Sequence, residues 1–173
     1  MPRYPRQLSA GANNAVIALS ETEVAKIFTG DTRSDIGSEG EKMRAANAIN
    51  GLVARFVRLD YDDALQADML VMERLFPMDF RAWEWERREL LLDVFEDELT
   101  QLHEAGFVHR DLRRPSGIGG QYFDNILLTG QGLRLIDVGI SALRSQVGDK
   151  LFEKYLETER AEMAEFRHFF LER

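Results

Sequence analysis

The chain has 173 residues and no cysteine, and its 30 acidic side chains outnumber its 22 basic ones, which gives a net charge of −8. These values exclude disulfides and thiolate metal sites and argue against a nucleic-acid partner, whose phosphates attract the opposite charge. No run approaches 18 apolar residues and no apolar segment follows the basic N-terminus, so we expect no membrane span, no secretory signal and a cytoplasmic protein.

The first part of the chain predicts a β-hairpin. After a tail at residues 1–7, residues 14–19 and 23–28 form short β-type runs separated by a polar turn. Lys26 interrupts the second run, and a lysine in mid-strand is usually an edge or solvent-facing residue. Strand alternation nevertheless places Lys26 on the same face as the apolar Val24.

The next segments predict one helix and two more strands. Residues 35–50 are rich in helix-forming side chains and are followed by Gly51, which suits a helix end. Residues 52–59 and 68–72 have β-type composition and flank an acidic turn at residues 60–63. The first half is therefore mostly β-structure with one helix.

Two helices are expected after residue 75, over residues 79–85 and 87–105, and Gly106 ends the second. Trp83 and Trp85 are expected to pack rather than to bind a cofactor. The longer helix has apolar residues at intervals of three and four, which predicts a buried stripe made of Leu91, Val94, Phe95, Leu99 and Leu102.

Residues 109–139 carry the polar groups that point to chemistry. His109-Arg110-Asp111 follows the long helix, and Asn125 opens an apolar strand at residues 126–128. A second apolar run at residues 133–136 ends at Asp137. These two apolar runs predict a β-hairpin whose ends bring the polar groups together. Phosphoryl transfer uses such a set, in which one Asp orients a hydroxyl while an Asn and an Asp hold metal against nucleotide phosphates.

The C-terminal segment, residues 140–173, predicts one or two charged, amphipathic helices. A packed terminal helix is the favoured interpretation, and a partner-docking surface is the alternative. The apolar positions at helical spacing are Leu151, Phe152, Tyr155, Leu156, Met163, Phe166, Phe169 and Phe170.

Together these motifs resemble the protein-kinase-like family. His109-Arg110-Asp111 is similar to its catalytic-loop signature, Asn125 to its metal-binding Asn, and Asp137-Val138-Gly139 to its Asp-Phe-Gly triplet. The resemblance spans most of residues 8–141 and is similar in outline to RIO-like kinases and to shortened kinases that bacteria deliver into host cells. It implies a two-lobed α+β fold, with a β-rich lobe at residues 1–75 and a truncated helical lobe at residues 76–173.

The resemblance also implies the roles of individual residues. Lys26 would hold the α and β phosphates of ATP, Asp111 would orient and deprotonate the acceptor hydroxyl, and Arg113 could contact the γ-phosphate. A helix glutamate would orient Lys26. The family's spacing favours Glu41 over Glu39, and the two positions are about 200° apart around a helix, so only one can face the lysine.

Cofactor contacts follow from the same resemblance. Asn125 and Asp137 would hold Mg²⁺, with Mn²⁺ as its substitute. The residues expected to contact the nucleotide are Gly11, Val16, Val24, Lys26, Met72, Glu73, Leu75 and Leu127.

The sequence departs from the family in several places. Asp111 and Asn125 are 14 positions apart instead of the family's five, so the segment between them is nine residues longer. Val138 replaces Phe, only Gly11 matches the family's glycine-rich loop, and the segment after Gly139 is too short for an activation segment and peptide platform. We therefore keep three functions: a minimal protein kinase with an unidentified protein substrate, a pseudokinase-like binding module, and a small-molecule kinase.

Overall fold

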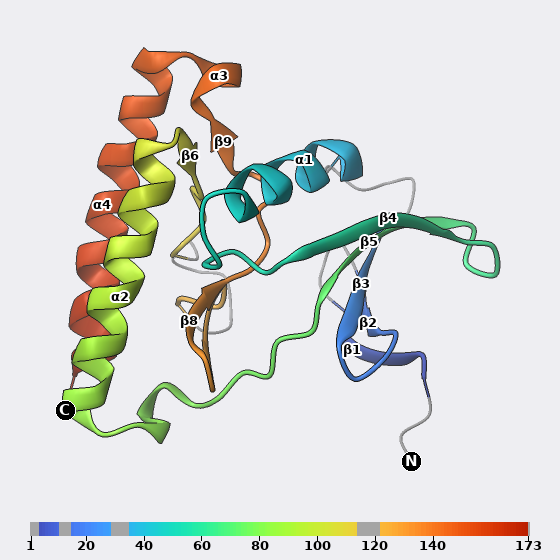
Figure 1. The fold of residues 1–173 in the computed structure, drawn as a ribbon, viewed down its shortest axis with the longest axis horizontal. Coiled ribbons are helices and arrows are strands. Elements are labelled where there is room, and N and C mark those ends of the chain that lie inside the picture. The colour runs from blue at the N-terminus through green and yellow to red at the C-terminus, as the bar shows by residue number, and fades with distance from the viewer. Residues whose placement is uncertain (1–3, 11–14, 29–34, 114–121, 173) are drawn as a thin grey trace.

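The computed structural model describes residues 4–10, 15–28, 35–113 and 122–172. It combines antiparallel strands with helices, which confirms the predicted α+β class. In Figure 1 the largest sheet lies at one side, and helices α2 (Trp85–Glu104) and α4 (Asp149–Leu171) lie side by side at the other. The hairpin of β7 (Ile126–Thr129) and β8 (Gly132–Leu135) lies between the largest sheet and these two helices. None of the helices in these ranges is long and apolar enough to cross a membrane.

The largest sheet has five antiparallel strands in the order β1-β2-β3-β5-β4. Their bounds are Arg6–Ala10 for β1, Ala15–Ala18 for β2, Glu23–Phe28 for β3, Phe56–Asp62 for β4 and Ala67–Glu73 for β5. β3 matches the predicted run, and β5 is one residue longer at each end. β1 was not predicted, because its residues were assigned to the tail and to the turn after it.

The strand predicted at residues 52–59 begins later than expected. Residues 52–54 leave the large sheet and pair with β8 (Gly132–Leu135) instead: Val53 forms a parallel bridge with Leu135, and the Ala54 amide donates to the Leu135 carbonyl at 2.8 Å. This segment therefore joins the two halves of the chain through backbone hydrogen bonds.

The strand register places the predicted lysine on a shared face. Lys26 lies opposite Val16 on β2 and opposite Leu70 on β5. Two residues along the strands, Val24 lies opposite Met72. Because paired residues of antiparallel strands point to the same side, these side chains form one face of the sheet. The opposite face has its own cluster of buried residues: Ala25, Ile27, Ala67, Met69 and Val71.

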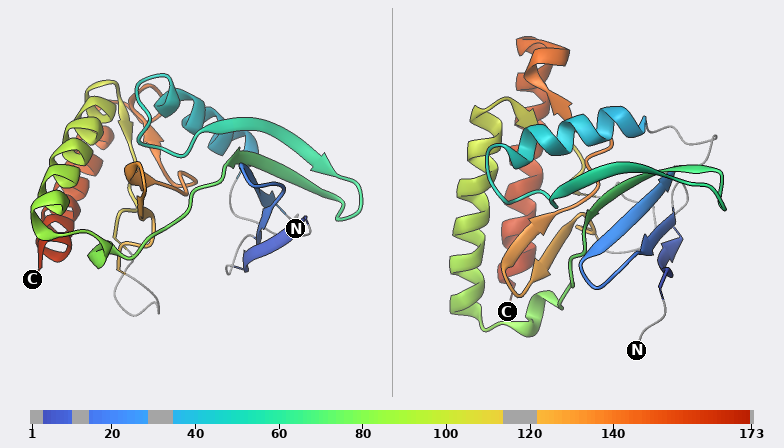
Figure 2. Two further views of the ribbon diagram at one scale, coloured as in Figure 1. Left: turned by 60° about the horizontal axis from the view of Figure 1, so that its bottom comes forward. Right: turned by 45° about the vertical axis from the view of Figure 1, so that its right-hand side comes forward.

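Helix α1 (Ile36–Asn47) packs against β4 and is shorter than predicted. Asp35 caps its first turn by accepting a hydrogen bond from the Gly37 amide at 2.9 Å. Figure 2 shows this arrangement from two other sides, with the β4–β5 hairpin extending away from α2 and α4.

The helix predicted at residues 79–85 is only a 3₁₀ turn, Phe80–Ala82, whereas α2 forms nearly as predicted. Val94 was assigned to the buried stripe of α2 but is 57% exposed. Trp85 Nε1 donates to the Leu171 carbonyl at 3.0 Å, so this tryptophan joins α2 to the end of α4, as expected for a packing residue.

Two short sheets follow α2. Phe107–Val108 (β6) pairs with Ala142–Leu143 (β9), and Ile126–Thr129 (β7) pairs with β8 in the predicted hairpin. Gly106 precedes β6 with a φ of +90°, and a Cβ atom there would lie 3.2 Å from the Arg144 Cβ, so a glycine is required at this turn.

A turn of helix, α3 (Arg144–Val147), leads into α4. The predicted packed terminal helix is confirmed, because its apolar stripe is buried: Phe152, Leu156, Met163, Phe166 and Phe170. Leu151 and Phe169 from the predicted set are exposed instead. The main core is continuous across residue 75, since it holds Phe28, Met43 and Leu70 together with Leu92, Phe95 and Leu128.

Candidate active site

Lys26 of β3 and Glu39 of α1 form a buried ion pair. Lys26 Nζ donates to the two Glu39 carboxylate oxygens at 2.9 and 3.1 Å, and the side chains are 8% and 2% exposed. The prediction that Glu41 orients Lys26 is therefore wrong. Glu41 lies on the exposed side of α1, where its Oε1 accepts a hydrogen bond from Gln146 Nε2 at 3.2 Å.

The same lysine reaches Asp137 from the other half of the chain. Lys26 Nζ lies 2.8 Å from Asp137 Oδ1, and we call Lys26, Glu39 and Asp137 the Lys26 network. The Asp137 side chain is 49% exposed, and its backbone has a φ of +57°, a left-handed conformation that non-glycine residues seldom adopt. Lys26, which was predicted to bind phosphate, and Asp137, which was predicted to bind metal, are thus in contact.

The pKa values of the network follow from its geometry. Burial alone lowers the pKa of Lys26, but the negative charges of Asp137 and Glu39 outweigh this effect and raise it above its ordinary value. Burial raises the pKa of Glu39, and Lys26 offsets this only in part. For Asp137, burial is again the largest influence and acts upward, yet Lys26 and the Gly139 amide together bring its pKa below the usual range. Lys26 is therefore held as a cation, and Asp137 as an anion.

Asn125 and Asp111 are also in contact. Asn125 Nδ2 donates to the Asp111 carbonyl at 2.8 Å and to Asp111 Oδ2 at 3.0 Å. The Asn125 carbonyl in turn accepts from the Ile136 amide at 3.0 Å, which links it to the strand that ends at Asp137. The 14-residue separation of Asp111 and Asn125 therefore does not keep them apart.

The donor set fits a magnesium-nucleotide complex. Because Asn125 Nδ2 donates hydrogen bonds to Asp111, the Asn125 Oδ1 atom is the one that could bind a metal. Within the described ranges no cluster of three or more His, Cys, Asp or Glu residues could hold a metal. Mg²⁺ usually takes one or two protein side chains and completes its shell with phosphate oxygens and water, and Asn125 with Asp137 is a set of that kind.

The loop at residues 109–113, here the HRD loop, is fixed by its histidine. His109 is fully buried, and its Nδ1 accepts from the Asp111 amide at 3.3 Å. The other ring nitrogen, Nε2, lies 2.9 Å from the Ile136 carbonyl and is therefore the protonated one. His109 therefore packs and bonds the backbone, and it joins the HRD loop to the strand before Asp137.

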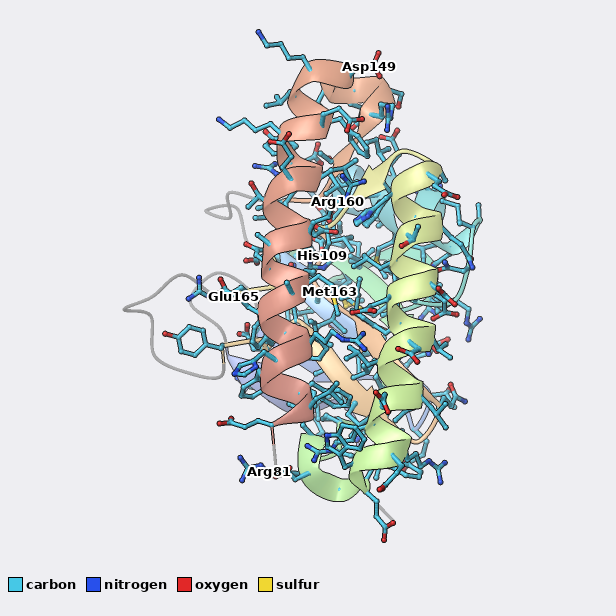
Figure 3. The ribbon with its side chains drawn as sticks, turned by 90° about the vertical axis from the view of Figure 1, so that its left-hand side faces the viewer. Arg81, His109, Asp149, Arg160, Met163 and Glu165 are labelled. Atoms are coloured by element: carbon cyan, nitrogen blue, oxygen red, sulfur yellow. The ribbon has the colours of Figure 1, made fainter. Side chains whose placement is uncertain are left out.

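Helix α4 supports the same loop with acidic residues that the sequence did not reveal. The fully buried Glu159 accepts the Arg110 amide at 2.5 Å and lies 2.8 Å from His103 Nε2. Glu162 of the same helix is also close to this loop, since the amides of Leu112 and Arg113 act to lower the pKa of its carboxyl. Burial and the nearby Glu159 raise the pKa of Glu162. Figure 3 shows the molecule from the side of α4, with His109 beyond this helix.

Arg113 forms an ion pair with a residue of α4. The Arg113 Nε atom lies 2.9 Å from Glu165 Oε2, which is within ion-pair distance. The Nε–H bond does not point at this oxygen well enough to form a hydrogen bond. The guanidinium also lies 5.3 Å from the centre of the Tyr122 ring. Glu165 is on the side of α4 that faces away from α2 (Figure 3). The predicted γ-phosphate contact of Arg113 stays a prediction, and in this conformation the guanidinium is paired with Glu165.

Three of the predicted nucleotide contacts lie together with Lys26 on the large sheet. Val16, Val24 and Met72 share the sheet face of Lys26, which places them beside the Lys26 network. Leu127 is half-buried and alternates with the core residues Ile126 and Leu128 of β7. Gly11 lies outside the described residues.

Two further predicted nucleotide contacts, Glu73 and Leu75, lie at and after the end of β5. The Glu73 side chain pairs with Arg134 of β8 and accepts the Arg55 amide at 2.8 Å, so it joins the end of β5 to the β7–β8 hairpin. Leu75 is half-buried against the main core. The nucleotide contacts of Glu73 and Leu75 stay predictions.

No protein-family model matches this chain, and a search of curated proteins finds no match. The assignment of a function therefore depends on the geometry described above.

Proposed function

We propose that this protein is an ATP-dependent phosphotransferase that uses Mg²⁺ and transfers the γ-phosphoryl group to a hydroxyl. The observation that carries the proposal is the position of the Lys26 amine, 2.9 Å from Glu39 and 2.8 Å from Asp137. A buried, charged amine between a helix carboxylate and a half-exposed carboxylate suits the phosphates of a nucleotide and the cation that accompanies them.

Each side chain has a role in this reaction. Lys26 binds the α and β phosphates, and Glu39 orients the amine. Asn125 and Asp137 would hold Mg²⁺, which neutralises charge on the phosphates when bound. Asp111 takes the proton from the acceptor hydroxyl as the oxygen forms its bond to the γ-phosphorus. The bond between that phosphorus and the β–γ bridging oxygen breaks, and ADP leaves.

The acceptor is either a protein hydroxyl, including one of this chain, or a small molecule. Asp111 lies where the HRD loop meets Asn125, so the acceptor hydroxyl binds at this end of the β7–β8 hairpin. The side chains that select the acceptor are those that surround this point.

The decisive experiment is incubation of the purified protein with γ-labelled ATP and Mg²⁺, beside Asp137→Ala and Asp111→Asn. We expect the wild type to label itself or an added acceptor, and both variants to lose at least 100-fold in rate, the scale of a lost catalytic base. Labelling by Asp137→Ala at the wild-type rate would contradict the proposal.

A binding module without turnover is the second candidate. It is favoured by the location of the best-defined contacts. The Lys26 network suits a nucleotide and its metal, whereas removal of the proton from the acceptor depends on Asp111 alone. This candidate predicts that ATP with Mg²⁺ raises the melting temperature of the wild type, that Asp137→Ala abolishes the rise, and that no label is transferred.

A further inference from the structure

Lys42 is a buried cation that the proposed reaction does not use. It lies on α1 three positions after Glu39 and is 8% exposed. Its Nζ donates to the Gly139 carbonyl at 2.8 Å. A lysine side chain is long enough to reach solvent from most helix positions, so its inward course toward a backbone carbonyl needs a specific reason.

Keeping this cation inside the protein has a cost. Burial lowers the pKa of Lys42, and the positive charge of Arg110 acts in the same direction, while Glu39 opposes both. Burying an amine is unfavourable unless it is hydrogen-bonded. An apolar residue at position 42 would avoid this cost, but it could not hold Gly139.

The contacts of Lys42 and of the Lys26 network close a ring. Glu39 and Lys42 leave the same helix within one turn; Glu39 binds Lys26, which binds the Asp137 carboxylate, and Lys42 binds the carbonyl of Gly139. Asp137 and Gly139 are only two positions apart. Helix α1 therefore holds residues 137–139, here the DVG loop, at a side chain and at a carbonyl.

The conformation of Asp137 makes this second attachment useful. Its φ of +57° is unfavourable for a residue with a Cβ and persists only where the surroundings determine it. Arg110 gives further support, since its NH1 donates to the Ile140 carbonyl at 2.8 Å and its guanidinium lies 3.8 Å from the Tyr155 ring centre. Two cations thus bind two consecutive carbonyls, those of Gly139 and Ile140.

We propose that Lys42 is a positioning residue that couples helix α1 to the DVG loop and so sets the geometry of the metal ligand Asp137. The metal-ligand role rests on the function proposed above, whereas the coupling itself does not. Lys42 acts through the Gly139 backbone and touches neither nucleotide nor metal.

The first test needs no ligand. Lys42→Met keeps the length and apolar stem of the side chain and removes the donor, and Lys42→Arg keeps a cationic donor. In ligand-free protein we expect amide hydrogen exchange over residues 136–143 to rise about tenfold in Lys42→Met, the effect of one lost hydrogen bond, and to return toward the wild-type rate in Lys42→Arg. Unchanged exchange in this segment, or an equal rise over the whole chain, would overturn the coupling.

The second test addresses the metal. For Lys42→Met we expect the Mg²⁺ concentration at half-maximal phosphoryl transfer to rise about tenfold, while the affinity for ATP without metal stays unchanged. An unchanged Mg²⁺ dependence would overturn the role of Lys42 at Asp137. If the wild type transfers no phosphate, the proposed function fails, and the exchange test still decides whether Lys42 holds the loop.

Discussion

Three charged side chains meet at Lys26, and their relative burial decides what each can do. Glu39 is enclosed, so its charge is available only to the lysine, whereas Asp137 is half-exposed and can also meet a ligand. A buried ion pair adds little stability, because desolvation opposes the attraction. Its value here is geometric: it fixes the amine at a place where phosphates can reach it.

Glu39 and Glu41 offer a matched pair for testing this. Glu39→Ala removes the buried partner of Lys26, and we expect the free energy of unfolding to fall by about 2 kcal/mol; this is less than the ~3–5 kcal/mol of a pair broken outright, because Asp137 still holds the lysine. Glu41→Ala removes an exposed side chain from the same helix and should change it by less than about 0.5 kcal/mol. Urea denaturation measures both.

Nucleotide affinity should separate the two variants in the same way. We expect Glu39→Ala to weaken ATP binding and Glu41→Ala to leave it unchanged, as measured by displacement of a fluorescent nucleotide. A larger loss in Glu41→Ala than in Glu39→Ala would show that the pairing in the structure is not the one used by the bound state.

The depressed pKa of Asp137 predicts how its contribution depends on pH. A carboxylate whose pKa is lower in the folded protein stabilises the fold above its unfolded pKa of about 3.9 and loses that contribution as the pH falls through the folded value. The stability difference between the wild type and Asp137→Asn should therefore be constant from pH 7 to about pH 5 and shrink below about pH 4. A difference that grows on acidification would contradict this assignment.

At the level of elements, α4 is both a core helix and the support of the HRD loop. Its buried stripe packs against Phe80, Phe95 and Phe123, whose ring centres lie 5.1–5.8 Å from that of Phe166. Its buried Glu159 accepts the Arg110 amide of the loop that begins at His109. Any shift of α4 therefore changes the position of Asp111.

Glu159 tests this support. Glu159→Ala leaves the Arg110 amide and His103 without their acceptor, and at about 1–3 kcal/mol for each buried polar group we expect a loss of about 3 kcal/mol in unfolding free energy. Glu157→Ala, at an exposed position of the same helix, should cost less than about 0.5 kcal/mol. Equal effects of the two substitutions in urea titrations would exclude the supporting role.

The sequence predicted the participants of the site better than their partners. Strand alternation placed Lys26 correctly, and the apolar runs around Asn125 and Asp137 formed the expected hairpin. Glu159 was missed, and Glu41 was favoured over Glu39. Both Glu39 and Glu159 nevertheless occupy buried positions of their helices, near Met43 in one case and between Leu156 and Met163 in the other. An acidic residue inside an apolar stripe was the available signal, because buried charges are rare and need partners.

At the level of the whole molecule, one core spans both halves of the chain. The boundary expected at residue 75 is crossed by core packing, by the backbone bonds between residues 52–54 and β8, and by the Lys26–Asp137 pair. A short apolar run such as residues 52–54 is compatible with a strand in either the large sheet or the β7–β8 sheet, and its local pattern does not show which of the two sheets it joins. Strand β1 was not predicted for the same reason, since its pairing with β2 depends on tertiary contacts and not on its local sequence pattern.

This shared core predicts a single cooperative unfolding transition. We expect the tryptophan fluorescence of Trp83 and Trp85 and the far-ultraviolet circular dichroism to change together on heating, with equal calorimetric and van't Hoff enthalpies. Two separated transitions would mean that the β-rich and helical halves unfold independently.

Strand β4 has a consequence for how copies of the protein behave in solution. It ends the order of the large sheet, and most of its residues are exposed, with Arg58, Asp60 and Asp62 among its seven positions. Terminal strands recruit strands from other molecules unless charge discourages it. Repulsion between the aspartates of two approaching copies keeps such strands apart, so the protein should stay dispersed at concentrations where an uncharged border would begin to form fibrils.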